Sequence, residues 1–346
     1  MEKMSKIRAA ITGVAGYLPK DVLTNEDITR MVDTTEEWIM SRVGIKERHV
    51  LKGEGLGTSD MAVKAVEELF RKTGTSPDEV DLLVWCGVTA DQMFPATANI
   101  ISDKLGVKNA FSFDINAGCS SFLFSLATVA PFIETGRCKK VVLIGAENLT
   151  KFVDYTDRTT CPLFGDGAAA VLLEPTTDDL GFVDSITRVD GSGRKHLYLQ
   201  AGGSVIPPSM ETILRRQHFV YQDGPVVFKA AVSRMADTSL ELMERNNLTS
   251  NDISWLLPHQ ANLRIIDATG NRMGLSRDKV MINIDKSGNT SSATVPLCLW
   301  DYESQLKKGD NIIITTFGAG YTWGAAYIKW AYDGVRDITK GLTGNI

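Results

Sequence analysis

The second half of this sequence repeats the first, and this repeat limits the possible folds more than any other feature. Four segments recur in the same order at nearly one offset, close to half of the 346-residue chain. The matched positions are Asp81 with Asp252 (252 − 81 = 171), Gly106 with Gly274 (274 − 106 = 168), Cys119 with Asn289 (289 − 119 = 170) and Val141 with Ile312 (312 − 141 = 171). Repetition at a fixed spacing indicates duplicated structural units. We therefore expect two similar halves, residues 1–180 and 181–346, packed about a pseudo-twofold axis.

Within each half, segments typical of strands alternate with segments typical of helices. Apolar runs at 81–88 and 140–145 predict buried strands, and amphipathic patterns at 59–73 and 226–246 predict helices. This alternation predicts an α/β fold with buried central sheets. Residues 190–225 are rich in Gly and Pro and carry no periodic pattern, so we expect a long surface excursion there, near the mouth of a site.

Composition excludes several classes of function. A formal net charge of −5 argues against general affinity for nucleic acid, and the longest nearly apolar run, 122–133, is too short to span a bilayer. Five cysteines without a Cys-x-x-Cys motif fit neither a disulfide framework nor a zinc site. Four histidines lack metal-binding spacing, so we expect no metal or other cofactor. The first eight residues lack the apolar core of a secretory signal, and we expect a reduced, cytoplasmic protein.

The segment 111–135 contains the best candidate for a nucleophile. Residues 111–115 alternate like a strand, Gly118 permits a sharp turn, and residues 122–135 are apolar on all sides, as expected of a fully buried helix. We expect Cys119 at the first residues of this helix, where unpaired N–H groups and the helix dipole favour a thiolate. The alternative is a buried cysteine that packs as a small hydrophobic side chain.

The second half supplies candidate partners for this thiol. His259 follows a strand-like segment, at the carboxyl end where α/β folds place their sites, and Asn289 occupies the repeat position of Cys119. The Gly-rich segment 317–324 offers backbone N–H groups for an oxyanion site. A Cys-His-Asn set remains ambiguous, because in papain-like hydrolases the Asn orients the His. Alternatively, a neutral His and an Asn donate hydrogen bonds to a thioester oxygen, which suits the enolate formed when a malonyl thioester loses carbon dioxide.

Trp38 and Arg42 lie one helical turn apart in a segment that predicts a helix beginning near Thr34. An aromatic plane beside a guanidinium suits a nucleotide base and its phosphate. The alternative is a core tryptophan beside a solvated arginine.

Together, four motifs resemble the β-ketoacyl-acyl carrier protein synthase III family over essentially the whole chain. They are Asn116-Ala-Gly-Cys-Ser-Ser, Pro258-His-Gln-Ala-Asn-Leu-Arg, Ser287-Gly-Asn-Thr-Ser and Phe317-Gly-Ala-Gly-Tyr-Thr-Trp-Gly. The resemblance implies a thiolase-like five-layer αβαβα fold of two pseudo-symmetric duplicated halves, assembled as a homodimer. It implies the first condensation of type II fatty-acid synthesis, in which Cys119 takes an acyl group from a short acyl-CoA. Malonyl-acyl carrier protein, held by His259 and Asn289, then decarboxylates, and its carbanion attacks the Cys119 thioester.

The resemblance also implies roles for residues around this centre. It places the acyl oxyanion at the backbone amides of Cys119 and Ala319, where family members commonly have Gly in place of Ala319. The residues it implies for binding acyl-CoA are Thr34, Trp38, Arg42, Arg158, Gly224, Phe228 and Asn262. It implies an acyl pocket at Phe317 and at Phe94, which would reach into the partner subunit, and a carrier-protein surface at Lys229, Gln260 and Arg264.

Other readings of the same motifs differ in chemistry. Degradative thiolases use a second Cys as base, which the Asn289 motif does not provide. Chalcone-synthase-like enzymes share the Cys-His-Asn set but extend a CoA starter with malonyl-CoA. A cysteine thioesterase would use His259 to activate water, and a silent acyl-CoA-binding protein would not need all three reactive residues. The sequence leaves the choice of acyl primer open.

Overall fold

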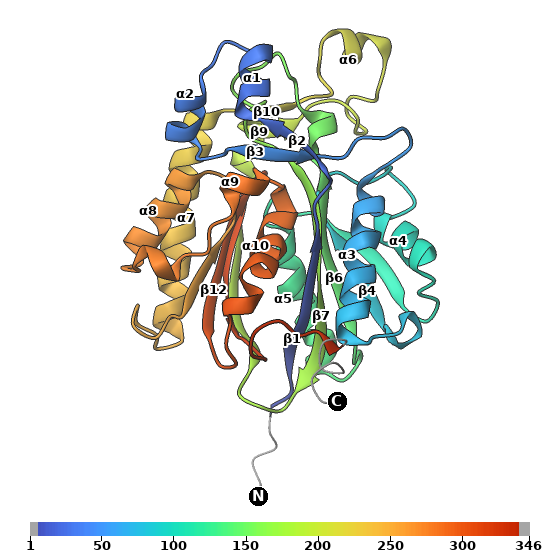
Figure 1. The fold of residues 1–346 in the computed structure, drawn as a ribbon, viewed down its shortest axis with the longest axis vertical. Coiled ribbons are helices and arrows are strands. Elements are labelled where there is room, and N and C mark those ends of the chain that lie inside the picture. Colours follow the sequence, from blue (N-terminus) through green and yellow to red (C-terminus); the bar gives the residue numbers. More distant parts are fainter. Residues whose placement is uncertain (1–5, 339–346) are drawn as a thin grey trace, which may run out of the picture.

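Two mixed β-sheets form the frame of the computed structural model, which describes residues 6–338 (Figure 1). The first sheet has the order β1-β7-β6-β4-β5 and the second the order β11-β12-β13-β8. The first contains β1 (Arg8–Tyr17), β4 (Leu82–Cys86), β5 (Phe111–Ile115), β6 (Val141–Asn148) and β7 (Asp166–Thr176). The second contains β8 (Gly181–Val189), β11 (Trp255–Pro258), β12 (Asn311–Gly318) and β13 (Thr322–Lys329).

The two sheets share one pairing pattern, as the sequence repeat predicts. β4 runs parallel to β6 as β11 runs parallel to β12, and the next two pairings in each sheet are antiparallel. The strands of the first sheet precede residue 180 and those of the second follow it. The duplicated α/β architecture is confirmed, while the exact division into residues 1–180 and 181–346 stays a prediction.

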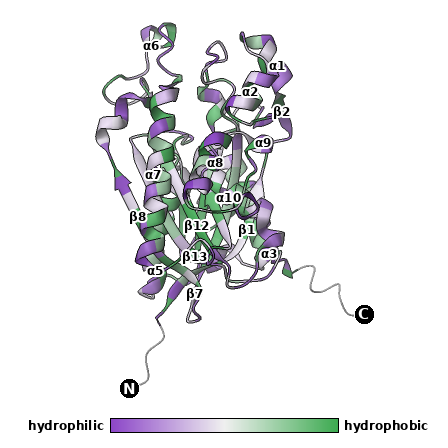
Figure 2. Ribbon diagram, turned by 90° about the vertical axis from the view of Figure 1, so that its left-hand side faces the viewer, coloured by the Kyte–Doolittle hydropathy of each residue, from purple (hydrophilic) through white to green (hydrophobic). Residues whose placement is uncertain are grey.

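Helices form three layers around the sheets, giving the order helix, sheet, helix, sheet, helix (Figure 1). The central layer is α5 (Ser121–Glu134) and α10 (Thr294–Tyr302). The outer layers are α3 (Thr58–Thr73) with α4 (Thr97–Leu105) on the first sheet, and α7 (Gly224–Arg245) with α8 (Leu263–Arg272) on the second. Outer helices carry hydrophilic segments, whereas the inner strands such as β12 are largely hydrophobic (Figure 2).

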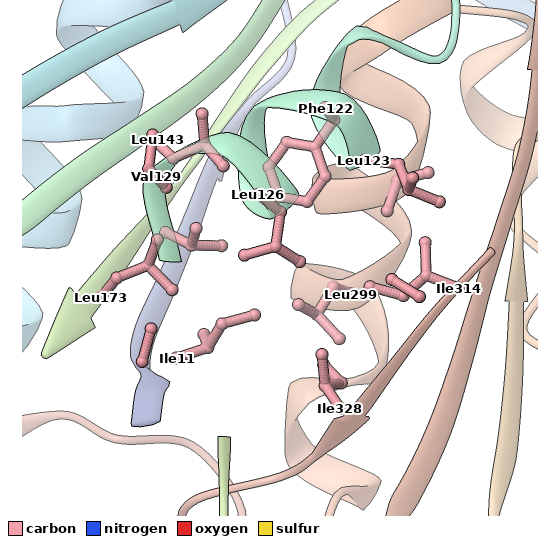
Figure 3. Packing of buried hydrophobic residues seen from close by; sticks show 14 of the residues in the cluster. Ile11, Phe122, Leu123, Leu126, Val129, Leu143, Leu173, Leu299, Ile314 and Ile328 are labelled. Carbon is pink, nitrogen blue, oxygen red and sulfur yellow. The ribbon is translucent and has the colours of Figure 1, made fainter. Parts of the chain in front are cut away.

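The core between the sheets joins the two halves. Phe122 and Leu126 of α5 pack with Leu299 of α10 and with the strand residues Leu143 and Ile314 (Figure 3). Each of these side chains is fully buried, which stabilises the fold by about 1.5–3 kcal/mol per side chain. The helices that follow Cys119 and Asn289 in the chain are therefore held by this fully buried core.

One face of α5 departs from the prediction of burial on all sides. Thr128 and Pro131 on this helix are exposed, and Phe132 is half-buried. Phe132 lies against Phe111 of the edge strand β5, with ring centroids 5.9 Å apart. The apolar sequence of α5 thus serves both the core and a surface beside the sheet edge.

The repeat fails at one element. The residues ahead of Asn289 form a short helix, α9 (Ile284–Ser287), where the first half has strand β5 ahead of Cys119. In the second sheet, a single bridge between Leu256 and Val280 stands beside β11. Only the first sheet therefore ends in a full additional strand.

The excursion at 190–225 is more regular than its sequence predicts. It contains β9 (Leu197–Leu199) paired antiparallel with β10 (Val220–Gln222), and α6 (Met210–Leu214) between them. The smaller elements near it are β2 (Asp21–Thr24), α1 (Asn25–Met31), α2 (Glu36–Arg42) and β3 (Glu47–Val50). These pieces gather at one end of the sheets, above the central helices (Figure 1).

A buried ion pair also links the halves. Lys72 of α3 donates to Glu303, which follows α10, over 2.5 Å, and both side chains are almost fully buried. No helix between residues 6 and 338 is long and apolar enough to cross a membrane. Residues 1–5, part of the segment from which the absence of a secretory signal is predicted, lie outside the described residues.

Candidate active site

A cavity of about 670 Å³ contains the three residues that the sequence predicts as reactive. Cys119, His259 and Asn289 all line it. Cys119 comes from the turn between β5 and α5, His259 directly follows β11, and Asn289 lies between α9 and α10. Segments from both halves therefore converge on one site.

Two glycine turns meet backbone to backbone beside Cys119. Gly118 has φ +61°, and a Cβ there would lie 2.7 Å from the amide nitrogen of Ala319. A Cβ on Gly318 would lie 2.6 Å from the amide nitrogen of Cys119. The Thr322 hydroxyl donates a hydrogen bond to the carbonyl of Ala117 over 2.5 Å, which links the two turns. Only glycine at these positions lets the amides of Cys119 and Ala319 approach each other.

The ionisation of Cys119 differs from the prediction. Cys119 lies two residues ahead of Ser121, the first residue of α5, so it is not part of the helix. Burial raises the pKa of the Cys119 thiol to about 11, although the Ser291 hydroxyl and the backbone amides of Cys119 and Ala319 act in the opposite direction. This raised pKa is opposite in direction to the one expected for a thiol at a helix start. The thiol needs a base to react.

His259 lines the same cavity as Cys119 and is held there by its backbone and its ring. Its backbone N–H donates to the Thr315 carbonyl over 2.8 Å, which fixes it at the end of the parallel pair β11 and β12. Burial lowers the pKa of His259 to about 3, so the imidazole is neutral near pH 7. Its Nδ1 lies 2.6 Å from Oγ1 of Thr294, the first residue of α10.

Asn289 is tied to the first half by its backbone. Its N–H donates to the Leu163 carbonyl over 2.9 Å, and its carbonyl accepts from Gly165 over 3.1 Å. Its side-chain Oδ1 accepts the backbone N–H of Ser291 over 2.8 Å. Asn289 lies two residues ahead of Ser291, where a 3-10 turn (Ser291–Ala293) runs directly into α10. Cys119 likewise lies two residues ahead of α5, so the two residues occupy equivalent places just before a helical segment, although neither is part of a helix.

Sequence reasoning missed Ser291 and Thr294. Both are buried, and Ser291 also lines the cavity. Ser291 has φ +48°, a left-handed conformation that is uncommon for a residue with a side chain. Their proximity to Asn289 in the chain was the only signal, because serine and threonine at such positions usually report a local turn.

The predicted nucleotide-binding pair lies at the cavity. Trp38 and Arg42 both line it from α2, and the Arg158 guanidinium lies 5.4 Å from the Trp38 ring centroid. Arg158 itself does not line the cavity, and it lies 3.9 Å from Asp33. Thr34 does not line it either, and its buried hydroxyl has no hydrogen-bond partner among the described residues.

The other predicted ligand contacts lie along the cavity wall. Gly224, Phe228 and Asn262 line it. Asn262 also caps α8, because its Oδ1 accepts the Arg264 N–H over 2.9 Å while its Nδ2 donates to the Arg42 carbonyl over 3.0 Å. β9 and β10 of the excursion contribute further lining residues, in agreement with its predicted place at the site mouth.

The predicted carrier-protein surface needs one correction. Gln260 is fully buried, and its Nε2 donates to the carbonyls of Pro258 and Met281 over 2.8 and 3.2 Å. A residue without exposed atoms cannot contact a docking protein, so this prediction is wrong for Gln260. Lys229 and Arg264 are exposed, and Arg264 lines the cavity with its guanidinium 4.9 Å from the Phe228 ring centroid.

The two predicted acyl-pocket residues lie in different surroundings. Phe317 is buried, lines the cavity and packs on Tyr321, with ring centroids 4.8 Å apart. Phe94 is 80% exposed and does not line the cavity of its own chain. Its role in a partner subunit stays a prediction.

Comparisons with known proteins agree with this architecture. The family model described as 3-oxoacyl-[acyl-carrier-protein (ACP)] synthase III matches residues 113–191, and the model of the C-terminal part of that family matches residues 243–330. The chain is 56% identical over 334 residues to beta-ketoacyl-[acyl-carrier-protein] synthase III 2 of Bacteroides thetaiotaomicron, covering 96% of this chain and 100% of the relative. It is 48% identical over 328 residues to the synthase III of Chlorobaculum tepidum, covering 94% and 100%.

Solved structures give the same result. The 3-oxoacyl-[acyl-carrier-protein] synthase III of Aquifex aeolicus superposes with a TM-score of 0.86 at 37% identity, over 93% of this chain and 100% of that one. The synthase III of Thermus thermophilus superposes with a TM-score of 0.86 at 39% identity, over 93% and 99%. The fold is thiolase-like, and the chain belongs to the 3-oxoacyl-[acyl-carrier-protein] synthase III family.

Proposed function

We propose that this enzyme condenses a short acyl-CoA primer with malonyl-acyl carrier protein, releasing CoA and carbon dioxide and so initiating type II fatty-acid synthesis. The observation that carries the proposal is the meeting of Cys119, His259 and Asn289 in one cavity, beside the adjoining amides of Cys119 and Ala319. A nucleophile, a neutral imidazole and an amide suit a reaction with two thioester steps.

In the first step, the Cys119 thiol attacks the carbonyl of the acyl-CoA thioester. Since burial keeps this thiol protonated, the thiol loses its proton only as the S–C bond forms, and the neutral His259, which lines the same cavity, relays this proton to the departing CoA sulfur without holding it. The amides of Cys119 and Ala319 donate to the oxyanion of the tetrahedral intermediate. CoA then leaves as its thiolate and receives a proton, so that acyl-Cys119 and CoA are the products.

In the second step, malonyl-acyl carrier protein loses carbon dioxide within the cavity. The electrons of the broken C–C bond form an enolate, whose oxygen develops negative charge beside Asn289 and His259. The enolate carbon attacks the acyl-Cys119 carbonyl, and the Cys119 thiolate departs from the β-ketoacyl product. One proton restores the thiol.

Residues at the mouth support the proposed substrates. The Trp38 ring with the Arg42 and Arg158 guanidinium groups suits the adenine and phosphates of CoA. Exposed Lys229 and Arg264 lie beside the wall residue Phe228, where an acidic carrier protein could dock by charge complementarity. We propose a cytoplasmic location, because five free cysteines suit a reducing compartment.

We also propose that the protein is a homodimer joined at strand β5. β5 is the edge strand of the first sheet and pairs only with β4 among the described residues, which leaves one side of its backbone open. Phe111 on β5 is 40% exposed, and Met93 and Phe94, in the segment between β4 and α4, are 72% and 80% exposed. A second copy on this edge would cover apolar surface and carry Phe94 towards the partner's cavity.

Intact-mass analysis tests the proposed function directly. After incubation with a panel of acyl-CoAs, we expect a stable acyl adduct on the wild-type protein and none on Cys119→Ser. Addition of malonyl-acyl carrier protein should remove the adduct. We expect His259→Ala still to acquire its adduct but to fail in decarboxylation, because the enolate oxygen loses one of its two polar neighbours. We expect Asn289→Ala to acquire the adduct but to fail in decarboxylation.

Each other outcome points to a different enzyme. Rapid loss of the adduct in water alone would identify a thioesterase, and removal by malonyl-CoA in place of the carrier-linked form would identify a chalcone-synthase-like enzyme. Failure of Asn289→Ala to acquire an acyl group would instead support a hydrolase-like triad. The same panel identifies the preferred primer.

A further inference from the structure

A carboxyl group that the proposed reaction does not use lies behind the cavity wall. It belongs to Glu147 on β6, whose side chain is fully buried. No basic side chain among residues 6–338 forms an ion pair with it. A buried charge without a counter-ion is costly and persists only where other polar groups compensate it. The surroundings of Glu147 therefore decide whether it carries a charge.

Four hydrogen-bond donors point at this carboxyl group. The Val88 N–H lies 3.0 and 3.1 Å from its two oxygens, and the Ser292 N–H lies 3.4 Å from Oε1. Thr89 donates to Oε2 twice, from its N–H over 2.9 Å and from its hydroxyl over 2.5 Å. Burial raises the pKa of Glu147, but the Thr89 donors oppose this rise. Because backbone N–H groups can only donate, the pattern indicates an ionised carboxylate.

The donors come from segments of both halves that border the cavity. Val88 and Thr89 line it from the first half, just after β4. Ser292 belongs to the 3-10 turn Ser291–Ala293 of the second half, and the first residue of this turn also lines the cavity. Glu147 therefore connects two parts of the cavity wall that are distant in the sequence.

The same carboxylate acts on the thiol of Cys119. Burial raises the pKa of this thiol to about 11, the Ser291 hydroxyl opposes the rise, and the charge of Glu147 adds to it. The Ser291 hydroxyl also lowers the pKa of Glu147, so this hydroxyl lies beside both groups. The other titratable groups nearby are Cys86, whose pKa is raised by burial and also by Glu147, and the neutral His259. Neither brings a positive charge to the thiol.

We propose that Glu147 is an ionised positioning residue with two tasks: its oxygens hold the cavity walls of the two halves together, and its charge keeps the resting Cys119 a thiol. This inference rests on the proposed role of Cys119 as the nucleophile. Since the thiolate is the form of cysteine that attacks small electrophiles, the charge lowers the reactivity of the empty site. Glu147 itself gains and loses no proton in the reaction.

Glu147→Gln tests the effect of the charge, because glutamine has nearly the same shape without it. The ultraviolet absorbance of the thiolate is followed during a pH titration, and Cys119→Ser in the same background is subtracted to isolate Cys119. We expect the midpoint to fall by about one pH unit, the size of shift that a neighbouring charge produces. Glu147→Asp keeps the charge and should titrate like the wild type.

Hydrogen exchange tests the connection between the walls. In Glu147→Gln, the backbone amides of Val88, Thr89 and Ser292 lose a charged acceptor. We expect them to exchange about tenfold faster than in the wild type, as measured by mass spectrometry of the peptides that contain them. This readout requires no substrate.

Asp166→Asn is the matched control. Asp166 is also fully buried and lies at the start of β7, which pairs with β6. It accepts the Thr150 N–H over 2.9 Å and the Leu51 N–H over 2.8 Å, but it is not among the groups that shift the pKa of Cys119. This variant should speed exchange at its own two amides and leave the Cys119 titration unchanged.

Several outcomes would overturn the proposal. They are an unchanged midpoint or unchanged exchange in Glu147→Gln, and an equal fall of the midpoint in Glu147→Asp or Asp166→Asn. If Glu147→Gln does not fold, carbon NMR of labelled glutamate carboxyl groups in the wild type decides. The Glu147 signal, assigned by its loss in Glu147→Asp, should be that of a carboxylate near neutral pH, and a protonated group would contradict the inference. Failure of the wild type to form or transfer an acyl adduct would instead reject the proposed function and leave the titration standing.

Discussion

At the scale of single residues, burial acts on both ionisable groups of the site, raising the pKa of Cys119 and lowering that of His259. The Gly-Cys turn after a strand predicted Cys119 as a nucleophile, and the repeat drew attention to Asn289. The helix begins two residues too late to include Cys119, and burial dominates its pKa. Such an effect depends on side chains distant in the sequence, so local motifs could not reveal it. For the same reason, the sequence did not predict that His259 would bond to Thr294 and Thr315.

The pKa of Cys119 leads to a prediction about its reactivity. Because burial raises this pKa to about 11, the thiolate fraction of the resting enzyme keeps growing far above neutral pH. The rate of iodoacetamide alkylation at Cys119 should rise about tenfold per pH unit from pH 7 to 10, without levelling near 8.5, the pKa of a free thiol. Peptide mapping by mass spectrometry measures the rate.

The denatured protein serves as the control, since its exposed thiols should reach a plateau near their ordinary pKa. In the folded enzyme, a plateau near pH 8.5 would show that burial does not raise this pKa, and a plateau clearly below about 8.5 would show that the helix start stabilises the thiolate.

At the scale of elements, glycine patterns predicted the turns but not their mutual contact. The motif around Gly118 and the motif around Gly318 were recognised separately, and both turns follow strands as expected. A Cβ on Gly118 or Gly318 would collide with the other turn, and this contact depends on the tertiary structure. The first half has β5 ahead of Cys119 where the second has α9 ahead of Asn289, and the excursion contains an antiparallel strand pair. Such short segments take their structure from their neighbours.

Gly318→Ala should separate the two oxyanion amides. Its Cβ would lie 2.6 Å from the Cys119 nitrogen, so one turn must move. We expect the rate of Cys119 acylation to fall about 100-fold, as when one oxyanion donor is lost. Stopped-flow measurement of CoA release gives the rate, and circular dichroism verifies the fold.

Gly191→Ala is a suitable comparison, because its Cβ would meet no heavy atom within 4 Å. It should acylate like the wild type. Normal acylation in Gly318→Ala would mean that the turns are not a rigid pair.

At the scale of the whole molecule, the repeat predicted the architecture and the resemblance predicted the layers. Neither the repeat nor the resemblance predicted where the two halves differ. The first sheet continues into β5 and the second ends at a single bridge, so only one sheet offers a full open edge strand among residues 6–338. This difference underlies the proposed dimer.

Phe111→Lys should weaken that dimer. A charge on the edge strand would have to be buried against the second copy, so we expect the dissociation constant to rise at least about tenfold, corresponding to about 1.4 kcal/mol. Sedimentation velocity over a dilution series measures the change. The control is Leu240→Lys on α7, because Leu240 is 37% exposed and Phe111 is 40% exposed. Equal weakening by both variants, or by neither, would place the interface elsewhere.

The pairing of β1 with β7 has a consequence for how the chain is made. Arg8 lies opposite Thr176, so the first strand to leave the ribosome waits for a partner 168 residues later (176 − 8). At about 5–20 residues per second, synthesis takes about 10–30 s to supply that partner. During this interval β1, which is largely apolar, has no partner strand to pair with. β1 is thus among the last strands of its half to be paired, and we expect nascent chains paused before β7 to aggregate more readily than chains that contain it.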